Sequence, residues 1–500
     1  MRNQTAILSA FDRSSELSIS ELLAQTAIPR STLKRELNRL IDEGKIEAVG
    51  RGRGRYYRRM ATDEGSRVMV FKGGKLAGYL SYEAGRYRFV YERGYRGREL
   101  DGLARSETHQ AERLFAVFEN LIPESDRRDR YLAEGKNLVS ILLELGNTHG
   151  DFDFAEGGDV ADGFADHAPR INWLVAREAI LSHHTFPNVL TADIRIDPAI
   201  LHAVGKHSSL SGYQNKIDIT FDPDADSIIQ SPSGADHLLK PYNPANALYD
   251  YRNKEQNYLP YLGLNEHLFM SLAKNAYGFD VPWSGVVAGE RDFHYVVKRY
   301  DRHEGYKYEQ RDFAQIMNIP SDQKYYTTSE KLFDAVAKVI KSKAERIRVL
   351  EFYLFGFVIE HADLHTKNIS ILHIGRQTYR LSPLYDLIGN GVYHGDSDEL
   401  ALALGGKRSN LHPEDFYALA ERLEISRLQT RRSIRKIVGT FVEAFPDYIE
   451  ACHQMPHYDH LRTYTSRYTH GSFTDDLERF YRRRVASLRE RGFWDKKAKR

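Results

Sequence analysis

The sequence holds a single cysteine, Cys452, among 500 residues. One cysteine cannot form an internal disulfide, so a disulfide framework is excluded and a reducing compartment is favoured. The chain also lacks any apolar run close to the roughly 18 residues that a membrane-spanning helix needs. Nothing near its first residue resembles the apolar part of a signal peptide. We therefore expect a soluble, cytoplasmic protein.

Net charge is low over the whole chain, at +2, but it is unevenly distributed. Residues 1–60 contain 12 Lys and Arg against 7 Asp and Glu, a net charge of +5. A basic excess confined to one short segment is typical of contact with nucleic acid. With 41% hydrophobic residues, the chain can bury two or three cores, and its length favours about three domains.

The most informative pattern is His-Ala-Asp-Leu-His-Thr-Lys-Asn at residues 361–368, followed by Asp386. An apolar run at 351–359 predicts a buried helix that ends at this segment. Two β-like runs, 369–374 and 378–384, predict a hairpin that returns Asp386 to the loop. Two carboxylates and an amide at this spacing are what phosphoryl transfer from ATP requires.

Each polar residue of this pattern has a role in that chemistry. Mg²⁺ prefers oxygen ligands and bridges phosphates, and Asn368 and Asp386 can hold it. Asp363 is then left to orient the attacking hydroxyl or accept its proton. Lys367 can neutralise charge that develops on the transferred group. The structural alternative is a polar turn between a helix and a strand.

His361 and His365 open a second interpretation of the loop, a zinc site. They lie four residues apart, and no Cys or third His stands at ligand spacing beside them. We expect these histidines to brace the loop.

Segments upstream supply other parts of a kinase in the order a kinase uses them. A small polar loop at 208–216 precedes a β-like run and can turn backbone amides toward phosphate. Lys240 ends a short predicted strand and Glu266 opens a predicted amphipathic helix, so a Lys–Glu pair is expected. The run 295–302 predicts a strand entering a charged turn, which suits a hinge that holds adenine through its backbone and ribose through Asp301. Separately, each segment also fits a structural role, as a surface lysine, a helix-start glutamate or a solvated edge strand.

Together these motifs resemble the HipA family of bacterial serine/threonine kinase toxins. The motifs that carry the resemblance are Ser-x-Ser-Gly-x-Gln-x-Lys (209–216), Leu-Lys-Pro (239–241), Asn-Glu (265–266), Val-Lys-Arg-Tyr-Asp-Arg (297–302), Asp-x-His-x-Lys-Asn (363–368) and Pro-Leu-Tyr-Asp (383–386). Gly73–Leu80 and Phe118–Glu124 resemble that family's amino-terminal subdomain, so the resemblance spans residues 66–440. It implies an α+β, two-lobed body of the protein-kinase type.

The resemblance also implies roles for single residues. Asp363 is implied as the catalytic aspartate, Asn368 and Asp386 as magnesium ligands, and Ser209 as the serine on which such kinases phosphorylate and silence themselves. The implied contacts to ATP, including the hinge and ribose contact, are Lys240, Glu266, Lys298, Tyr300, Asp301, Gly212, Gln214 and Lys216. Lys298 stands where the family often has Glu. A translation factor such as an aminoacyl-tRNA synthetase is the implied protein substrate.

The first sixty residues predict a different kind of domain. Short helices are expected from Ala6 and from Ser18, and a third at 29–43 is expected to bury Leu33, Leu37, Leu40 and Ile41. Two β-like runs then flank a turn of glycine and arginine, so the segment predicts a winged helix-turn-helix that binds double-stranded DNA. The predicted DNA contacts are Arg30, Ser31, Lys34 and Arg35 on the third helix, and Arg51, Arg53 and Arg55 in the wing. The alternative is a solvated charged turn on a protein-binding domain.

This fusion resembles the subgroup of HipA-like proteins that carry a helix-turn-helix in the same chain, and it suggests that the module binds an operator and restrains the kinase. We expect four parts: the winged helix-turn-helix at 1–62, the amino-terminal subdomain at 66–150, the nucleotide-binding lobe at 151–305 and a mainly helical lobe at 306–500. The basic stretch Arg482–Arg484 with the last five residues is expected to be a solvated helix and frayed end, with a second DNA contact as the alternative.

Two other functions stay open on the sequence alone. Small-molecule kinases of the aminoglycoside phosphotransferase type carry a similar His-x-Asp-Leu-His-x-x-Asn loop, and the loop at 209–216 with the amino-terminal subdomain favours a protein-directed enzyme over them. A transcriptional regulator that senses nucleotide without turning it over is the second alternative.

Overall fold

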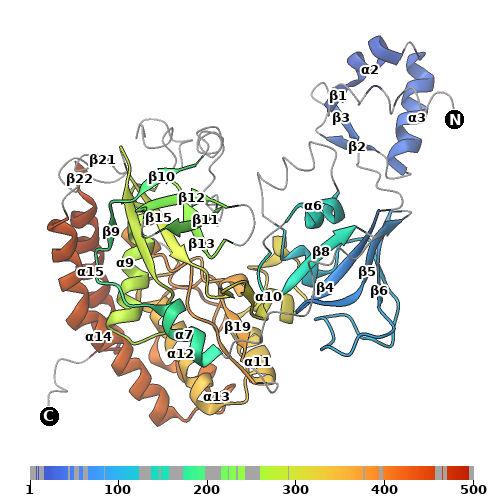
Figure 1. The fold of residues 1–500 in the computed structure, drawn as a ribbon. Coiled ribbons are helices and arrows are strands. Elements are labelled where there is room, and N and C mark those ends of the chain that lie inside the picture. The colour runs from blue at the N-terminus through green and yellow to red at the C-terminus, as the bar shows by residue number, and fades with distance from the viewer. Residues whose placement is uncertain are drawn as a thin grey trace. The chain divides into compact units, whose positions relative to one another are not determined.

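Elements of the chain group into two compact units, one of residues 1–148 and 152–166, the other of residues 149–151 and 167–500 (Figure 1). The computed structural model describes residues 7, 10, 16–26, 28–42, 46–49, 56–59, 66–83, 85–122, 137–145, 148–156, 173–196, 216–222, 225–231, 235–242, 259–290, 292–374, 378–393, 398–455, 464–465 and 470–494. The predicted division into four parts differs from these two units, because the first unit contains both the predicted winged helix-turn-helix and the predicted amino-terminal subdomain. Their division stays a prediction.

The first unit begins with a small module that has its own core. Its elements are β1 (Glu16–Ser18), α2 (Ile19–Thr26), α3 (Arg30–Asp42), β2 (Ile46–Val49) and β3 (Tyr56–Arg59), with the strands paired in the order β1-β3-β2. Ser18 caps α2 by accepting a hydrogen bond from the Glu21 amide, as predicted. Leu33, Leu37 and Leu40 are fully buried, and Ile41 is partly buried. Two of the predicted helices and the predicted strand pair are therefore present, and the helix expected from Ala6 falls largely outside the described residues.

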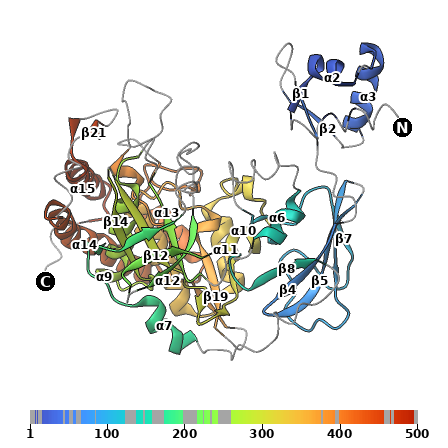
Figure 2. The same cartoon turned by 45° about the horizontal axis from the view of Figure 1, so that its top comes forward.

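A five-stranded antiparallel sheet forms the rest of the first unit (Figure 2). Its elements are β4 (Ser66–Lys72), β5 (Lys75–Glu83), β6 (Arg86–Tyr91), β7 (His109–Ala111), α4 (Ala116–Glu119), α6 (Leu138–Glu144) and β8 (Phe152–Glu156). The strand order is β7-β6-β5-β4-β8, and α6 packs on β4, β5 and β8. Alternation along β6 places Tyr87 and Phe89 in the core beside Phe118.

A seven-stranded sheet forms one part of the second unit. Its elements are α7 (Trp173–Leu181), β9 (Val189–Leu190), β10 (Asp193–Arg195), β11 (Ile217–Asp222), β12 (Ser227–Gln230), β13 (His237–Lys240), α9 (Leu262–Asn275), β14 (Ser284–Ala288) and β15 (Phe293–Lys298). The order is β10-β12-β11-β13-β15-β14-β9. Helix α9 packs on β14 and β15, and β13 pairs with β15, so β15 links the strand that carries Lys240 to the helix that carries Glu266.

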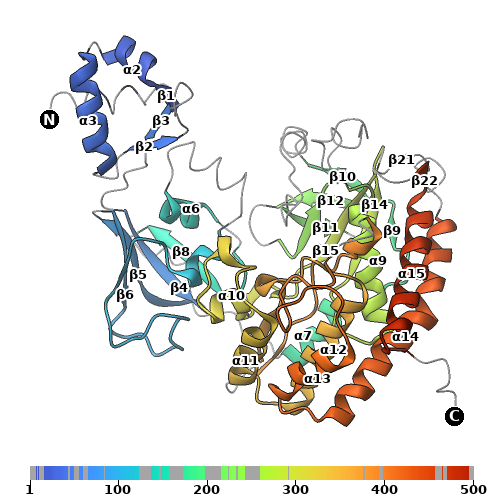
Figure 3. The same ribbon diagram turned by 180° about the vertical axis from the view of Figure 1, so that it is seen from behind.

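Helices dominate the rest of the second unit (Figure 3). The elements are β16 (Arg302–His303), β17 (Tyr306–Lys307), β18 (Gln310–Asp312), α10 (Phe313–Ile316), η4 (Ser321–Gln323), α11 (Ser329–Val339), α12 (Lys343–Val358), η5 (Thr366–Asn368), β19 (Ser370–His373), β20 (Tyr379–Leu381), η6 (Asn390–Val392), α13 (Pro413–Glu421), α14 (Arg427–His453), β21 (Tyr464–Thr465), β22 (His470–Gly471) and α15 (Phe473–Glu490), where η marks a 3₁₀ helix. Helix α14 contacts α9, α12, α13 and α15. No described helix is long and apolar enough to cross a membrane.

Two predicted details are wrong in α9. Glu266 does not open this helix, because α9 begins at Leu262 and Glu266 falls in its second turn. The helix is not amphipathic either: every residue from Gly263 to Ala273 is buried. The reason is that α9 packs against the sheet on one face and against α14 on another, so a polar face is absent and the carboxylate of Glu266 lies in the interior.

Candidate active site

The loop at 361–368 is held at the end of helix α12, whose last ten residues, 349–358, are all buried, as the apolar run predicted. Helix α12 ends at Val358, and Glu360 turns the chain with a positive φ of 51°. The His361 amide then donates to the Gly356 carbonyl at 2.8 Å. A Cβ on Gly356 would lie 2.5 Å from Cδ2 of Leu364, so a larger residue there would force the Leu364 side chain to move.

Asp363 and Asn368 are joined by a hydrogen bond across the loop. Asn368 Nδ2 donates to the Asp363 carbonyl oxygen at 2.9 Å. The ring of His365 caps η5, because its Nδ1 accepts the Lys367 amide at 3.2 Å. His361 is completely buried, and that burial lowers its pKa to about 4, so it is neutral at pH 7. The bracing role predicted for His365 is therefore present.

Asp386 returns beside this loop through the hairpin of β19 and β20, in which Ile371 pairs with Leu381. The residue before it is tied to the loop, because the Tyr385 hydroxyl donates to the Lys367 carbonyl at 2.6 Å. Asp386 itself has a positive φ of 51°, a backbone conformation that non-glycine residues rarely adopt and that clusters at functional sites. The predicted strands are present but shorter than the apolar runs.

Lys240 gathers two carboxylates from different elements. Its Nζ lies 2.7 and 2.8 Å from the two carboxylate oxygens of Glu266 on α9, and it also donates to Asp386 Oδ1. The other oxygen of Asp386 accepts from Lys216 at 3.1 Å. Lys240 is 4% exposed and Glu266 1%, so this pair is shielded from water, whereas Asp386 and Lys216 are partly exposed. The predicted Lys–Glu pair is confirmed, with Asp386 as a third member.

Burial and charge act in opposite directions on this cluster. Burial alone would raise the pKa of Asp386, but the ammonium groups of Lys216 and Lys240 outweigh it and hold that pKa well below its usual range. Burial alone would lower the pKa of Lys240, and the carboxylates of Asp386 and Glu266 reverse the shift. The pKa of Glu266 is raised to about 7 by burial, against the attraction of Lys240. Asp386 is thus the ionised partner of Lys240.

Residues 298–302, predicted as hinge and ribose contact, lie in a buried ionic cluster. Asp301 is 3% exposed, and its oxygens accept from Arg299 at 2.9 and 3.0 Å, from Arg302 at 3.0 Å and from the Gly150 amide at 2.9 Å. Burial would raise the pKa of Asp301, but Arg299 and Arg302 hold it well below its usual range. The Lys298 amide donates to the Trp283 carbonyl, and Tyr300 is buried.

Two residues that the sequence did not single out contact the loop from the segment after α10. The Tyr325 hydroxyl donates to Asp363 Oδ1, and Lys367 Nζ donates to Ser321 Oγ at 3.1 Å. Neither residue belongs to a motif or a periodic pattern, so no signal in the sequence pointed to them.

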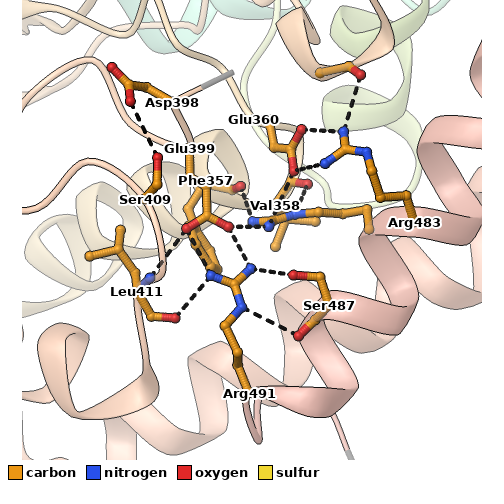
Figure 4. A network of polar contacts seen from close by, with 12 residues as sticks. Phe357, Val358, Glu360, Asp398, Glu399, Ser409, Leu411, Arg483, Ser487 and Arg491 are labelled. Carbon is orange, nitrogen blue, oxygen red and sulfur yellow. Dashed lines mark hydrogen bonds and ion pairs between the residues drawn. The ribbon is translucent and has the colours of Figure 1, made fainter. Parts of the chain in front are cut away.

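The basic stretch in α15 is also not the solvated helix that was predicted. Arg482 is solvated, but Arg484 is fully buried and donates to the carbonyls of Phe357 and Val358 at the end of α12. Figure 4 shows the neighbouring ion pairs, in which Arg483 binds Glu360 and Arg491 binds Glu399. These pairs hold the helix end from which the 361–368 loop starts. The last five residues lie outside the described part of the chain.

In the amino-terminal module, the predicted outward face of α3 is confirmed. Arg30, Ser31, Lys34 and Arg35 are exposed, and Arg35 makes a loose ion pair with Glu36 at 3.6 Å. The other predicted residues, Arg51, Arg53, Arg55, Ser209, Gly212 and Gln214, lie outside the described residues. Their roles stay predictions.

The donors present fit magnesium better than zinc. Among the described residues, no group of three or more His, Cys, Asp or Glu could hold a metal ion. One ionised carboxylate, Asp386, and one amide, Asn368, supply hard oxygen donors near the loop. Mg²⁺ takes few protein ligands and completes its octahedron with water and phosphate oxygens, so this donor set is sufficient for it when a nucleotide binds.

Comparisons with known proteins show what the chain is similar to. Residues 208–449 match the family model described as HipA-like C-terminal domain. A Sinorhizobium fredii protein named "Putative kinase Y4mE" is 28% identical over 51% of this chain and 60% of its own length, and a Haemophilus influenzae protein named "Putative kinase" is 28% identical over 39% of this chain and 57% of its own length. The chain thus spans little more than half the length of these curated relatives.

The fold is similar to that of a solved structure. The HipA chain from the complex of HipA, HipB and operator DNA of Shewanella oneidensis MR-1 superposes with a TM-score of 0.56, covering 85% of this chain and 97% of its own, at 16% identity. Residues 208–449 are thus similar to the HipA-like C-terminal domain, and the chain has a mixed α/β fold like that of the solved HipA chain.

Proposed function

We propose that this chain is an ATP- and Mg²⁺-dependent serine/threonine protein kinase of the HipA type, and that its amino-terminal module binds double-stranded DNA. The observation that carries the kinase proposal is the convergence of Lys240, Glu266 and Asp386, from a strand, a helix and the loop after a hairpin. A lysine paired with a helix glutamate, next to a metal-binding aspartate, is the arrangement that orients nucleotide phosphates in kinases.

In this proposal the chain's own groups divide the work. Lys240 and Lys216 place two positive charges where phosphate oxygens bind, and Asp386 with Asn368 would hold the metal. Bound Mg²⁺ supplies neutralisation of the phosphate oxygens. Asp363 orients the acceptor hydroxyl and takes its proton, because a carboxylate can act as a general base. Lys367 supports the loop through Ser321.

The test is transfer of the terminal phosphate of labelled ATP, in the presence of Mg²⁺, to the chain itself or to an added protein extract. We expect Asp363→Ala to lower the rate of phosphate transfer by several orders of magnitude, which corresponds to an increase of about 4 kcal/mol or more in activation free energy. A matched control is Asp193→Asn, because the side chain of Asp193 is 72% exposed on β10 and pairs with Arg195, which is exposed as well. This variant should label like the wild type.

The outcomes separate the proposal from its alternatives. Labelling of an aminoglycoside with no labelling of protein would favour a small-molecule phosphotransferase. Binding of ATP without turnover, equal in wild type and Asp363→Ala, would favour a nucleotide-sensing regulator. Mass spectrometry of the purified chain adds the site, because phosphate on Ser209 would support the silencing role that the resemblance implies.

The DNA-binding part of the proposal rests on the exposed basic face of α3. Arg30, Lys34 and Arg35 point away from the core formed by Leu33 and Leu37. Binding of the full chain to double-stranded DNA should weaken with salt. Replacing these three residues by Ala should reduce the slope of log K against log salt by roughly 0.9 for each DNA phosphate that they neutralise in the wild type.

A matched control exists in α14. Arg431, Arg432 and Arg435 are also exposed on a helix, and their replacement by Ala removes the same charge from the chain. If both triple variants lose affinity for double-stranded DNA equally, the binding reflects the overall charge of the chain, and the proposal that the basic face of α3 contacts DNA is wrong.

A further inference from the structure

Tyr325 reaches the predicted catalytic aspartate from outside every motif of the site. It follows η4, and its hydroxyl donates a hydrogen bond to Oδ1 of Asp363. The same oxygen lies 3.8 Å from Nε2 of His365. Asp363 is 22% exposed, so its carboxylate is neither locked in the core nor fully in water.

The ring of Tyr325 is itself held on the loop. It packs edge-on against His365, with ring centroids 4.9 Å apart at 80°, and the ammonium of Lys324 lies 5.3 Å from its centroid. Thr366 Oγ1 donates to the Lys324 carbonyl at 3.2 Å. Together with the Lys367 to Ser321 bond, the segment 321–325 therefore contacts four positions of the loop.

We propose that Tyr325 is a positioning residue that fixes the carboxylate of Asp363 for phosphoryl transfer; this inference rests on the kinase function proposed above. A general base must stand within hydrogen-bond reach of the proton it takes, and a small displacement of a reacting group costs up to about 100-fold in rate. Asp363 lies on a partly exposed loop, and the hydroxyl of Tyr325 holds one oxygen of its carboxylate in place.

The test uses Tyr325→Phe in the full chain, which removes the hydroxyl and keeps the ring. Its neighbour supplies the control, because Tyr326 is 82% exposed and Tyr326→Phe makes the same chemical change one residue away. Turnover of Mg²⁺-ATP, followed as release of ADP, gives kcat and KM for ATP. We expect Tyr325→Phe to lower kcat about 10- to 100-fold and to leave KM for ATP unchanged.

Two results would overturn this inference. In the first, Tyr325→Phe matches Tyr326→Phe in kcat and in KM for ATP, which would make the hydroxyl irrelevant to turnover. In the second, Tyr325→Phe raises turnover, which would mean that the hydroxyl blocks the acceptor position.

A readout independent of turnover is the thermal unfolding midpoint of Tyr325→Phe, Asp363→Ala and the double variant. Coupling predicts that Tyr325→Phe lowers the midpoint by about 2 °C or more in the wild type and by less in the Asp363→Ala background. Equal shifts in both backgrounds contradict the contact. Failure of the kinase proposal has a different signature, since the wild type would then release no more ADP than Asp363→Ala whatever the midpoints show.

Discussion

Some charged residues near this site are buried and form ion pairs with residues of opposite charge. Asp301 illustrates the point, because Arg299 and Arg302 surround it where little water reaches. Replacing Asp301 by Asn removes the negative charge and leaves two buried guanidinium groups with less compensation. We expect Asp301→Asn to lower the free energy of unfolding in urea by about 3–5 kcal/mol at pH 7.

The same residue gives a pH dependence with a definite sign. The pKa of Asp301 is lower in the folded chain than its ordinary value of 3.8, so its stabilisation is complete above pH 3.8 and is lost as the pH falls below that value. The difference in stability between wild type and Asp301→Asn should therefore shrink below about pH 4. Glu304→Gln, at a 73% exposed position on the next turn, should change stability by less than about 0.5 kcal/mol at any pH. A gap that stays constant with pH would contradict the assignment of this ion pair.

At the scale of elements, the loop at 361–368 depends on a helix more than one hundred residues away. Arg484 of α15 is 0% exposed, and it binds two carbonyls at the end of α12 together with the carboxylate of Glu399. Arg484→Met fills a similar volume but leaves Glu399 and Glu360 short of a partner. We expect this variant to lose about 3–5 kcal/mol of stability, measured by chemical unfolding.

The control is two residues earlier on the same helix. Arg482 is 76% exposed and pairs with Glu478 at i,i+4, so Arg482→Met should cost less than about 0.5 kcal/mol. Equal losses in the two variants would show that the helix tolerates methionine poorly and that the buried contact contributes nothing specific.

The contrast between these elements explains what sequence patterns can and cannot predict. The end of α12, the β19–β20 hairpin and the Lys240–Glu266 pair were predictable, because each follows from local hydrophobic periodicity or from a motif with known order. Tyr325 and Arg484 were not, because their partners are 38 and 126 residues away and hydropathy carries no signal for a polar contact across that distance. The burial of α9 was missed for the same reason, since its second apolar face meets α14.

On the scale of the whole molecule, the separate hydrophobic cores predict that DNA binding can be lost without loss of phosphate transfer. The amino-terminal module buries Leu37 completely in a cluster of its own, distinct from the large cluster of the second unit. Leu37→Ala should destabilise that module by about 2–5 kcal/mol. DNA binding should fall while phosphate transfer persists, and Leu428→Ala, at a 51% exposed leucine on α14, should leave both unchanged. Joint loss of both activities in Leu37→Ala would show that the module and the kinase body do not act separately.

The central claim is that Asn368 and Asp386 hold a divalent ion beside Lys240. It is tested most directly by a crystal structure of the full chain with a non-hydrolysable ATP analogue and Mn²⁺, whose anomalous signal locates the metal. We expect an anomalous peak for Mn²⁺ in contact with oxygens of Asn368, Asp386 and the analogue's phosphates, with Lys240 turned toward those phosphates. A metal peak away from both residues, or an analogue bound without contact to Lys240, would contradict it.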